Sequence, residues 1–104
     1  MANTTLDPTV IERHEEEIDI EEPKKYKVLL HNDNLTTFEF VIFLLANVFH
    51  KNAEEALYLT QQIHETGAGI AGIYSKEIAE EKVLESMQLA RRNNYPLVVT
   101  LEEY

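Results

Sequence analysis

The chain has 104 residues and a hydrophobic content of 44%, enough for one domain with a modest core and too little for a second domain. Its 19 acidic and nine basic residues give a formal charge of −10, which repels nucleic acid and anionic membranes, so neutral or cationic partners are expected. The sequence shows no signal or transit peptide pattern and no apolar stretch long enough to span a bilayer. We therefore expect a soluble intracellular protein.

The N-terminal segment carries most of the charge. Residues 1–22 hold eight acidic side chains against one basic side chain, that of Arg13. The few apolar residues of this segment bury too little surface to offset the entropy lost on ordering, and Pro23 closes it. The sequence therefore predicts a flexible acidic extension over residues 1–25 and a folded domain over residues 26–104.

The folded part begins with a β-strand and a helix. Residues 26–31 are rich in β-formers and predict a strand. Thr36 with Glu39 three residues later is typical of a capping box, so a helix is expected from Thr37 to about His50. The apolar residues of this helix extend beyond a normal stripe, which indicates contacts on more than one side.

The remaining elements are short and closely spaced. Asn52 and Glu55 repeat the capping pattern for a second helix that Gly67 ends, and Ser75 can cap a third helix. The expected elements are a helix at 53–66, a strand at 69–74, a helix at 76–93 and a strand at 97–101. The order β-α-α-β-α-β predicts a single small α+β domain, with a three-stranded antiparallel sheet covered by three helices on one side.

The densest polar cluster is Asn32-Asp33-Asn34, between the first strand and the first helix. One interpretation is turn chemistry, because Asn and Asp hydrogen-bond their own backbone. The other is a site: if the second helix packs beside the first, His64 approaches this loop and the apolar side chains of Phe38, Val41 and Ile63. Such a constellation suits an ammonium group on a hydrophobic stem.

Catalysis and metal binding are weaker interpretations. An Asp and a His can orient a nucleophile such as Thr36 or Ser75, but the sequence has no nucleophile elbow and no phosphate-binding glycine loop. The chain has no cysteine, and its four histidines do not form a recognised ligand spacing. We expect no catalytic residues, no metal and no cofactor.

The sequence from Tyr26 to Leu101 resembles the ClpS family of adaptors. The matching strings are YKVLLHND (26–33) with the following Thr36, EFVI (39–42), QQIHETG (61–67), GIYSKEIAEEKV (72–83) and PLVVTLE (96–102). The resemblance implies a non-enzymatic adaptor that binds the free N-terminus and the bulky hydrophobic first side chain of N-degron substrates. It further implies delivery of these clients to a Clp AAA+ unfoldase of the ClpA or ClpC type. The adaptor is expected to act as a monomer in the bacterial cytoplasm or the plastid stroma.

The same resemblance assigns roles to particular residues. It implies α-amino binding by Asn32, Asp33 and His64. The side-chain pocket is implied at Phe38, Val41, Thr60, Ile63 and Leu97, the loop residues Asn34 and Thr36 complete the candidate substrate-binding set, and the unfoldase contacts fall on Glu77 and Lys82.

The chain departs from the family pattern at three of these positions. Asn34 stands where a second Asp is usual, and Phe38 and Thr60 each replace a frequent Met. A rigid ring on one wall and a shorter side chain on another are expected to reshape the cavity. A different alternative is an interaction domain of the same topology that acts through a helical surface without a pocket, like the C-terminal domain of the ribosomal stalk protein.

Overall fold

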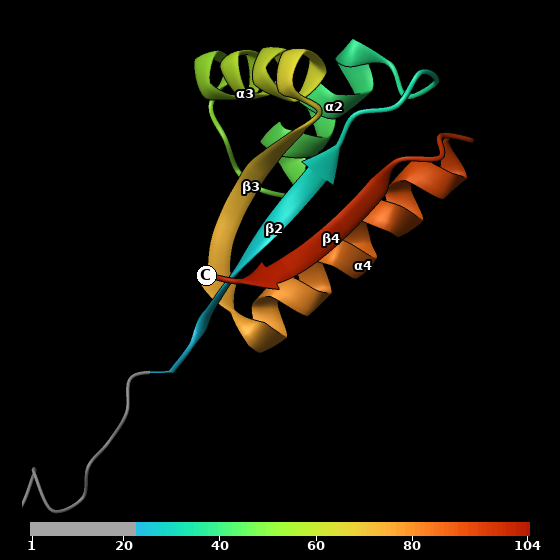
Figure 1. Ribbon diagram of the computed structural model, residues 1–104. Coiled ribbons are helices and arrows are strands. Elements are labelled where there is room, and N and C mark those ends of the chain that lie inside the picture. The colour runs from blue at the N-terminus through green and yellow to red at the C-terminus, as the bar shows by residue number, and fades with distance from the viewer. Residues whose placement is uncertain (1–22) are drawn as a thin grey trace, which may run out of the picture.

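The computed structural model describes residues 23–104 (Figure 1). The predicted extension covers residues 1–25, of which residues 1–22 lie outside the described residues and Lys25 is the first residue of β2. The elements are, in chain order, β2 (Lys25–His31), α2 (Phe38–Asn47), α3 (Ala53–Thr66), β3 (Ala68–Ser75), α4 (Lys76–Arg92) and β4 (Val98–Glu103). The predicted order β-α-α-β-α-β is confirmed, with strand boundaries that differ from the prediction by one or two residues.

The sheet is antiparallel throughout, and β2 is its central strand. β2 pairs with β3 on one side and with β4 on the other, and its last residue, His31, lies opposite both Ala68 and Val98. Val28 and Leu30 are completely buried and share one face of the pleated strand. Because β2 is paired on both edges up to His31, the loop that follows leaves the sheet from a fixed position.

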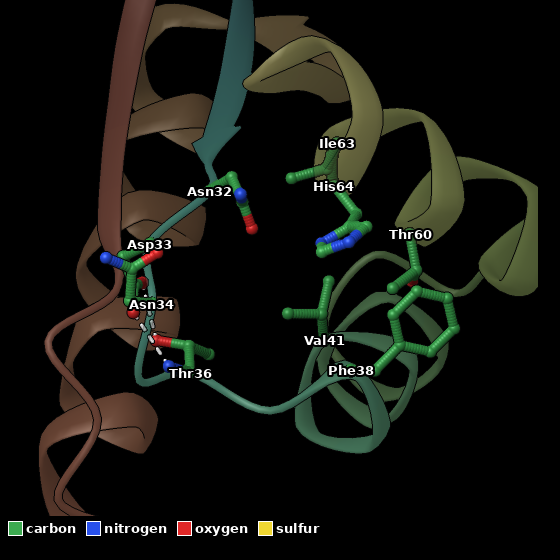
Figure 2. Close-up of a pocket in the computed structure, with 9 residues that line it drawn as sticks. All are labelled: Asn32, Asp33, Asn34, Thr36, Phe38, Val41, Thr60, Ile63 and His64. Atoms are coloured by element: carbon green, nitrogen blue, oxygen red, sulfur yellow. Dashed lines mark hydrogen bonds between the residues drawn. The ribbon is translucent and has the colours of Figure 1, made fainter.

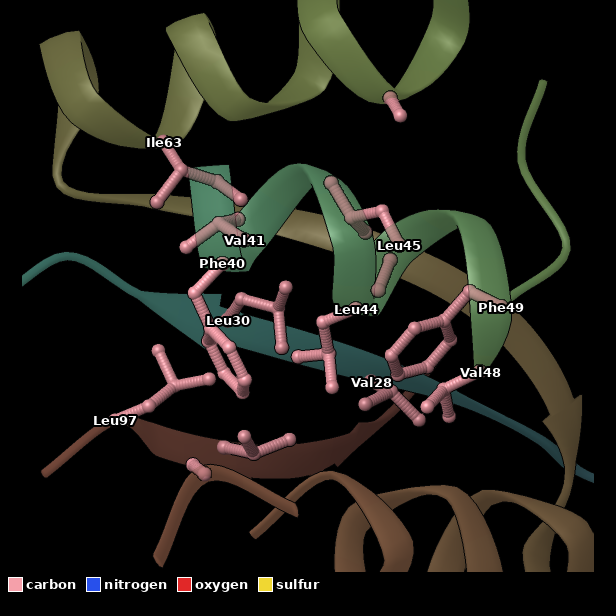
Figure 3. Close-up of a cluster of buried hydrophobic side chains, with 14 of the residues drawn as sticks. Val28, Leu30, Phe40, Val41, Leu44, Leu45, Val48, Phe49, Ile63 and Leu97 are labelled. Carbon is pink, nitrogen blue, oxygen red and sulfur yellow. The ribbon is translucent and has the colours of Figure 1, made fainter. Parts of the chain in front are cut away.

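The helices cover one face of this sheet. On the opposite face Ile70, Ile73 and Val98 are 40%, 42% and 47% exposed. The buried face packs into a single core with residues of all three helices (Figure 3). The predicted arrangement of three helices on one side of a three-stranded sheet is therefore confirmed.

Helix α2 lies between β2 and α3, which explains its wide apolar surface. Phe40 and Leu44 point toward the sheet, while Val41 and Leu45 point toward α3 (Figure 3). All four are buried. A helix that packs on two sides needs apolar residues beyond one stripe, as the sequence of this segment has.

The start of α2 differs from the sequence prediction. The N-cap is Thr37, whose hydroxyl oxygen accepts a hydrogen bond from the Phe40 N–H at 3.1 Å. The predicted Thr36–Glu39 capping box is wrong, because the Thr36 hydroxyl donates instead to Asp33 Oδ2 at 2.7 Å. The helix also ends at Asn47, three residues earlier than expected.

The caps of the other two helices agree with the prediction. Asn52 and Glu55 form the complete capping box at the start of α3. The helix ends at Gly67, whose φ of 100° lies in the left-handed region that favours glycine. Ser75 caps α4 through a hydrogen bond from the Ile78 N–H.

Candidate functional site

A pocket of about 240 Å³ lies at the end of the sheet where β2 leaves it (Figure 2). Three segments surround it: the loop after β2, the start of α2 and the C-terminal half of α3. Its lining residues are Asn32, Asp33, Asn34, Thr36, Phe38, Val41, Thr60, Ile63 and His64. Nine of the ten candidate substrate-binding residues are thus brought together from three elements that are separate in sequence.

The loop after β2 is built around the Asp33 carboxylate. Its Oδ1 accepts hydrogen bonds from the Leu35 N–H at 2.8 Å and the Thr36 N–H at 2.7 Å, and its Oδ2 accepts from the Thr36 hydroxyl. This is the turn chemistry that the sequence offered as one interpretation. The structure shows that turn and pocket rim coincide, because the same carboxylate shapes the loop and lies beside the cavity.

Asp33 also supplies negative charge to the rim. Burial raises the pKa of its carboxyl group, but the hydrogen bonds from Thr36 and Leu35 and the positive charge of Arg91 outweigh burial and lower that pKa below 3.8. The group is therefore ionised at neutral pH. A fixed negative charge at the mouth of an apolar pocket attracts a cationic group.

The rim continues through Asn32 and His64. The Asn32 N–H donates to the Gly67 carbonyl oxygen at 2.9 Å, which fastens the loop to the end of α3. The side chains of Asn32 and His64 both point into the cavity in Figure 2. An Asn amide oxygen and a neutral imidazole nitrogen are both hydrogen-bond acceptors, so the rim is suited to a group that donates several N–H bonds.

The deeper walls of the pocket are apolar. Val41, Thr60 and Ile63 are 6%, 2% and 2% exposed. The Thr60 hydroxyl donates to the Ala56 carbonyl oxygen at 2.6 Å within its own helix, so its hydrogen-bond requirement is met without a ligand. Phe38 closes the side next to α3, where its ring lies edge-on to that of His64 with centroids 6.3 Å apart.

Three predicted residues lie elsewhere. Leu97 is 1% exposed and packs in the core near Phe40 (Figure 3), and it is not among the residues that line the pocket. Glu77 lies in the first turn of α4. Lys82 donates from Nζ to the Val48 carbonyl oxygen at 2.7 Å, so it caps the C-terminal end of α2.

Two contributors to the site were missed from the sequence. Gly67 was assigned only as a helix end, yet its carbonyl oxygen holds the rim loop. Arg91 was given no role at the site, yet its positive charge helps to lower the pKa of Asp33. Both contributions depend on segments more than 30 residues apart, so local sequence patterns carry no signal for them.

Within residues 23–104 no group of three or more His, Cys, Asp or Glu side chains is placed to hold a metal ion. No helix in this range is both long enough and apolar enough to cross a membrane. The fold and the pocket thus define a small recognition domain, with a negatively charged polar rim above an apolar floor.

The sequence comparisons identify the family. The family described as "ATP-dependent Clp protease adaptor protein ClpS" matches residues 21–100, and the chain belongs to this family. The ClpS adapter protein of Clostridium acetobutylicum is 46% identical over 100 residues, which are 96% of this chain and 95% of that protein. The ClpS adapter protein of Lawsonia intracellularis is 48% identical over 84 residues, 81% of this chain and 77% of its own length.

A solved structure supports the same assignment. Agrobacterium tumefaciens ClpS2 bound to L-phenylalaninamide superposes with a TM-score of 0.77 and 32% sequence identity, covering 80% of this chain and all of that one. The resemblance read from the sequence is confirmed, and so is the prediction of a Clp protease adaptor rather than an enzyme.

Proposed function

We propose that this chain binds the free N-terminus and the bulky hydrophobic first side chain of N-degron clients in the pocket at the end of β2, and delivers these clients to a Clp AAA+ unfoldase. The observation that carries the proposal is the union of acceptors and negative charge with an apolar floor in one cavity of about 240 Å³. The Asp33 carboxylate also holds the loop in shape, whereas the side chains of Asn32 and His64 point into the cavity. Together the rim and the floor match the two halves of an N-terminal residue.

The rim supplies what a client ammonium needs. A protonated α-amino group has three N–H donors, and each one that leaves water requires an acceptor. The Asn32 amide oxygen and a His64 ring nitrogen supply two acceptors. Asp33 supplies charge, and its Oδ2 accepts one hydrogen bond within the loop and retains acceptor capacity for a direct or water-bridged contact.

The floor supplies what the first side chain needs. Burying a Phe or Leu side chain among Val41, Thr60 and Ile63 is worth about 1.5–3 kcal/mol. This contribution gives selectivity for large apolar residues, but micromolar affinity requires about 8 kcal/mol, so the ammonium contacts must provide much of the remainder. L-phenylalaninamide, bound in the relative of known structure, carries both an α-amino group and a benzyl side chain.

A peptide-binding experiment tests the pocket. The full chain is titrated with a labelled peptide that begins with Phe, with the same peptide acetylated on its α-amino group, and with one that begins with Ser. We expect binding of the free Phe peptide alone, because acetylation removes the charge and Ser leaves the floor empty. Equal affinity for the free and acetylated forms overturns the proposal and favours an interaction domain that works through a helical surface.

The delivery surface is proposed at the opposite end of the domain. Glu77 and Lys82 lie in the N-terminal half of α4, which follows Ser75, and Ser75 pairs with Lys25 at the start of β2. The pocket follows the other end of β2, about 20 Å away for a seven-residue strand. A client and an unfoldase can therefore occupy the two ends at the same time.

This surface is tested with the N-terminal domains of ClpA-type and ClpC-type unfoldases. Glu77→Lys is expected to weaken binding to the true partner at least several-fold while peptide affinity stays unchanged. Glu85→Lys, an exposed charge reversal on the same helix, serves as the control. Equal effects of the two variants would assign the loss of binding to the change in net charge and remove Glu77 from the contact.

We further propose that the chain acts as a monomer in the cytoplasm.

A further inference from the structure

The floor residue Ile63 packs directly against a glycine of β3, Gly69. Ile63 lines the cavity and is 2% exposed, and Gly69 of β3 lies behind it. A Cβ atom placed on Gly69 would lie 2.7 Å from Ile63 Cγ1 and 3.1 Å from Leu59 Cδ1. The first of these separations is shorter than carbon atoms tolerate, so Ile63 occupies space that any other residue at position 69 would fill.

The backbone does not require a glycine at this position. Gly69 is a strand residue paired with Leu30 of β2, and its φ lies outside the left-handed region. Gly67, two residues earlier, is the opposite case, with a φ of 100° and no atom close to an added Cβ. The need for glycine at position 69 is therefore a matter of side-chain space.

We propose that Gly69 is a specificity-determining residue, which sets the depth of the pocket by allowing Ile63 to sit back against β3. This inference rests on the proposed N-terminus binding. Protein interiors are close-packed, so a displaced side chain moves toward the nearest space that is not filled by other atoms. For Ile63 that space is the cavity itself, which it already lines.

A methyl group at position 69 should therefore shorten the pocket. The effect depends on the length of the client's first side chain, because a Phe ring reaches deeper than a Leu side chain. We expect Gly69→Ala to lower the affinity for a Phe peptide by on the order of tenfold more than the affinity for a Leu peptide, the scale at which one extra methyl overfills a packed site.

A second glycine provides the matched control. Gly72 lies on the same strand, and an added Cβ there would collide with the ring of Tyr74, which is not a pocket residue. Gly72→Ala is therefore expected to lower the melting temperature without changing the ratio of Phe to Leu affinity. A purely structural role of Gly69 predicts the same behaviour for both variants.

Two further variants test the direction of the effect. Ile63→Val shortens the side chain at the floor and is expected to raise the affinity for the Phe peptide relative to the Leu peptide. This change is opposite in direction to that expected for Gly69→Ala. The double variant Gly69→Ala with Ile63→Val is expected to recover most of the wild-type ratio, because valine has no Cδ1 to place in the cavity.

The outcomes separate this inference from the function on which it rests. If the wild-type chain binds neither peptide, the proposed function fails. If the wild-type chain binds both but Gly69→Ala weakens them equally, or Ile63→Val leaves the ratio unchanged, the role of Gly69 is refuted while the pocket stands. If Gly69→Ala does not fold, the ratio of Phe to Leu affinity measured for Ile63→Val tests the proposal in its place. A shift toward Phe supports it, and an unchanged ratio refutes it.

Discussion

Replacing Asp33 by Asn isolates the contribution of rim charge to binding. Asparagine keeps an Oδ1 acceptor for the Leu35 and Thr36 N–H groups, and its amide can donate to the rotatable Thr36 hydroxyl. The loop is therefore expected to keep its shape while the negative charge disappears. Asp33→Ala is the contrasting variant, since it removes the charge and all three hydrogen bonds together.

The size of the effect follows from the dimensions of the pocket. A cavity of about 240 Å³ is about 8 Å across if spherical, so an ammonium group inside it is expected within about 8 Å of the Asp33 carboxylate, and we take a separation of about 6 Å for the calculation. Two opposite unit charges at about 6 Å attract by about 1.4 kcal/mol at an effective dielectric constant of about 40, which suits a partly exposed site. That energy corresponds to about a tenfold change in affinity.

Fluorescence anisotropy with free and Nα-acetylated Phe peptides measures this charge term. Asp33→Asn should weaken binding of the free peptide about tenfold and leave the acetylated peptide as it was. The melting temperature should fall only slightly for Asp33→Asn and clearly for Asp33→Ala. An Asp33→Asn variant that binds the free peptide as tightly as the wild type does would show that the rim works through neutral hydrogen bonds alone, and the reasoning from charge would be wrong.

Three predictions concern stability rather than binding. The pKa of Asp33 in the folded protein is lowered below 3.8, so the carboxylate stabilises the fold fully above that pH. This stabilisation is lost as the pH falls through the pKa of the folded state. In acid titrations the difference in unfolding free energy between the wild type and Asp33→Asn should therefore shrink over that range. Gly67→Ala should lower the unfolding free energy by about 1 kcal/mol in urea titrations, since alanine is strained at a φ of 100°. Ser86→Ala should raise the unfolding free energy by about 1 kcal/mol, because within residues 23–104 the fully buried Ser86 Oγ meets no hydrogen-bond partner; an unchanged or lower value would indicate a partner such as a bound water.

The order of elements was predictable because each boundary carries a local chemical signal. Asn52 with Glu55, and Ser75, mark helix starts through hydrogen bonds that span three residues, and Gly67 marks a helix end through its own φ. Such features depend on neighbours within one turn of the chain, so a sequence pattern is sufficient to find them. The N-terminus of α2 was predicted one residue too early because two threonines stand side by side there. Only the competing carboxylate of Asp33 decides that Thr37 caps the helix.

The candidate site was predictable only in part for a similar reason. Asn32, Asp33 and His64 were brought together in the prediction by assuming that α3 packs beside α2, which the structure shows. Leu97 was also expected to line the pocket, but it lies against the core, because the chain turns into β4 beneath Phe40 rather than beside the cavity. Contacts between distant segments of this kind have no periodicity in the sequence.

The hydrogen bond from the Asn32 N–H to the Gly67 carbonyl oxygen has a kinetic consequence. It joins the rim loop to the end of the helix that carries Ile63 and His64, so the mouth and the floor of the pocket are linked directly and we expect the pocket to be preformed. A preformed receptor does not have to order a loop during the encounter, and association then proceeds without a slow rearrangement. Clients should accordingly differ mainly in their dissociation rates. A slow dissociation rate is what an adaptor needs if it is to keep a client bound until the unfoldase engages it.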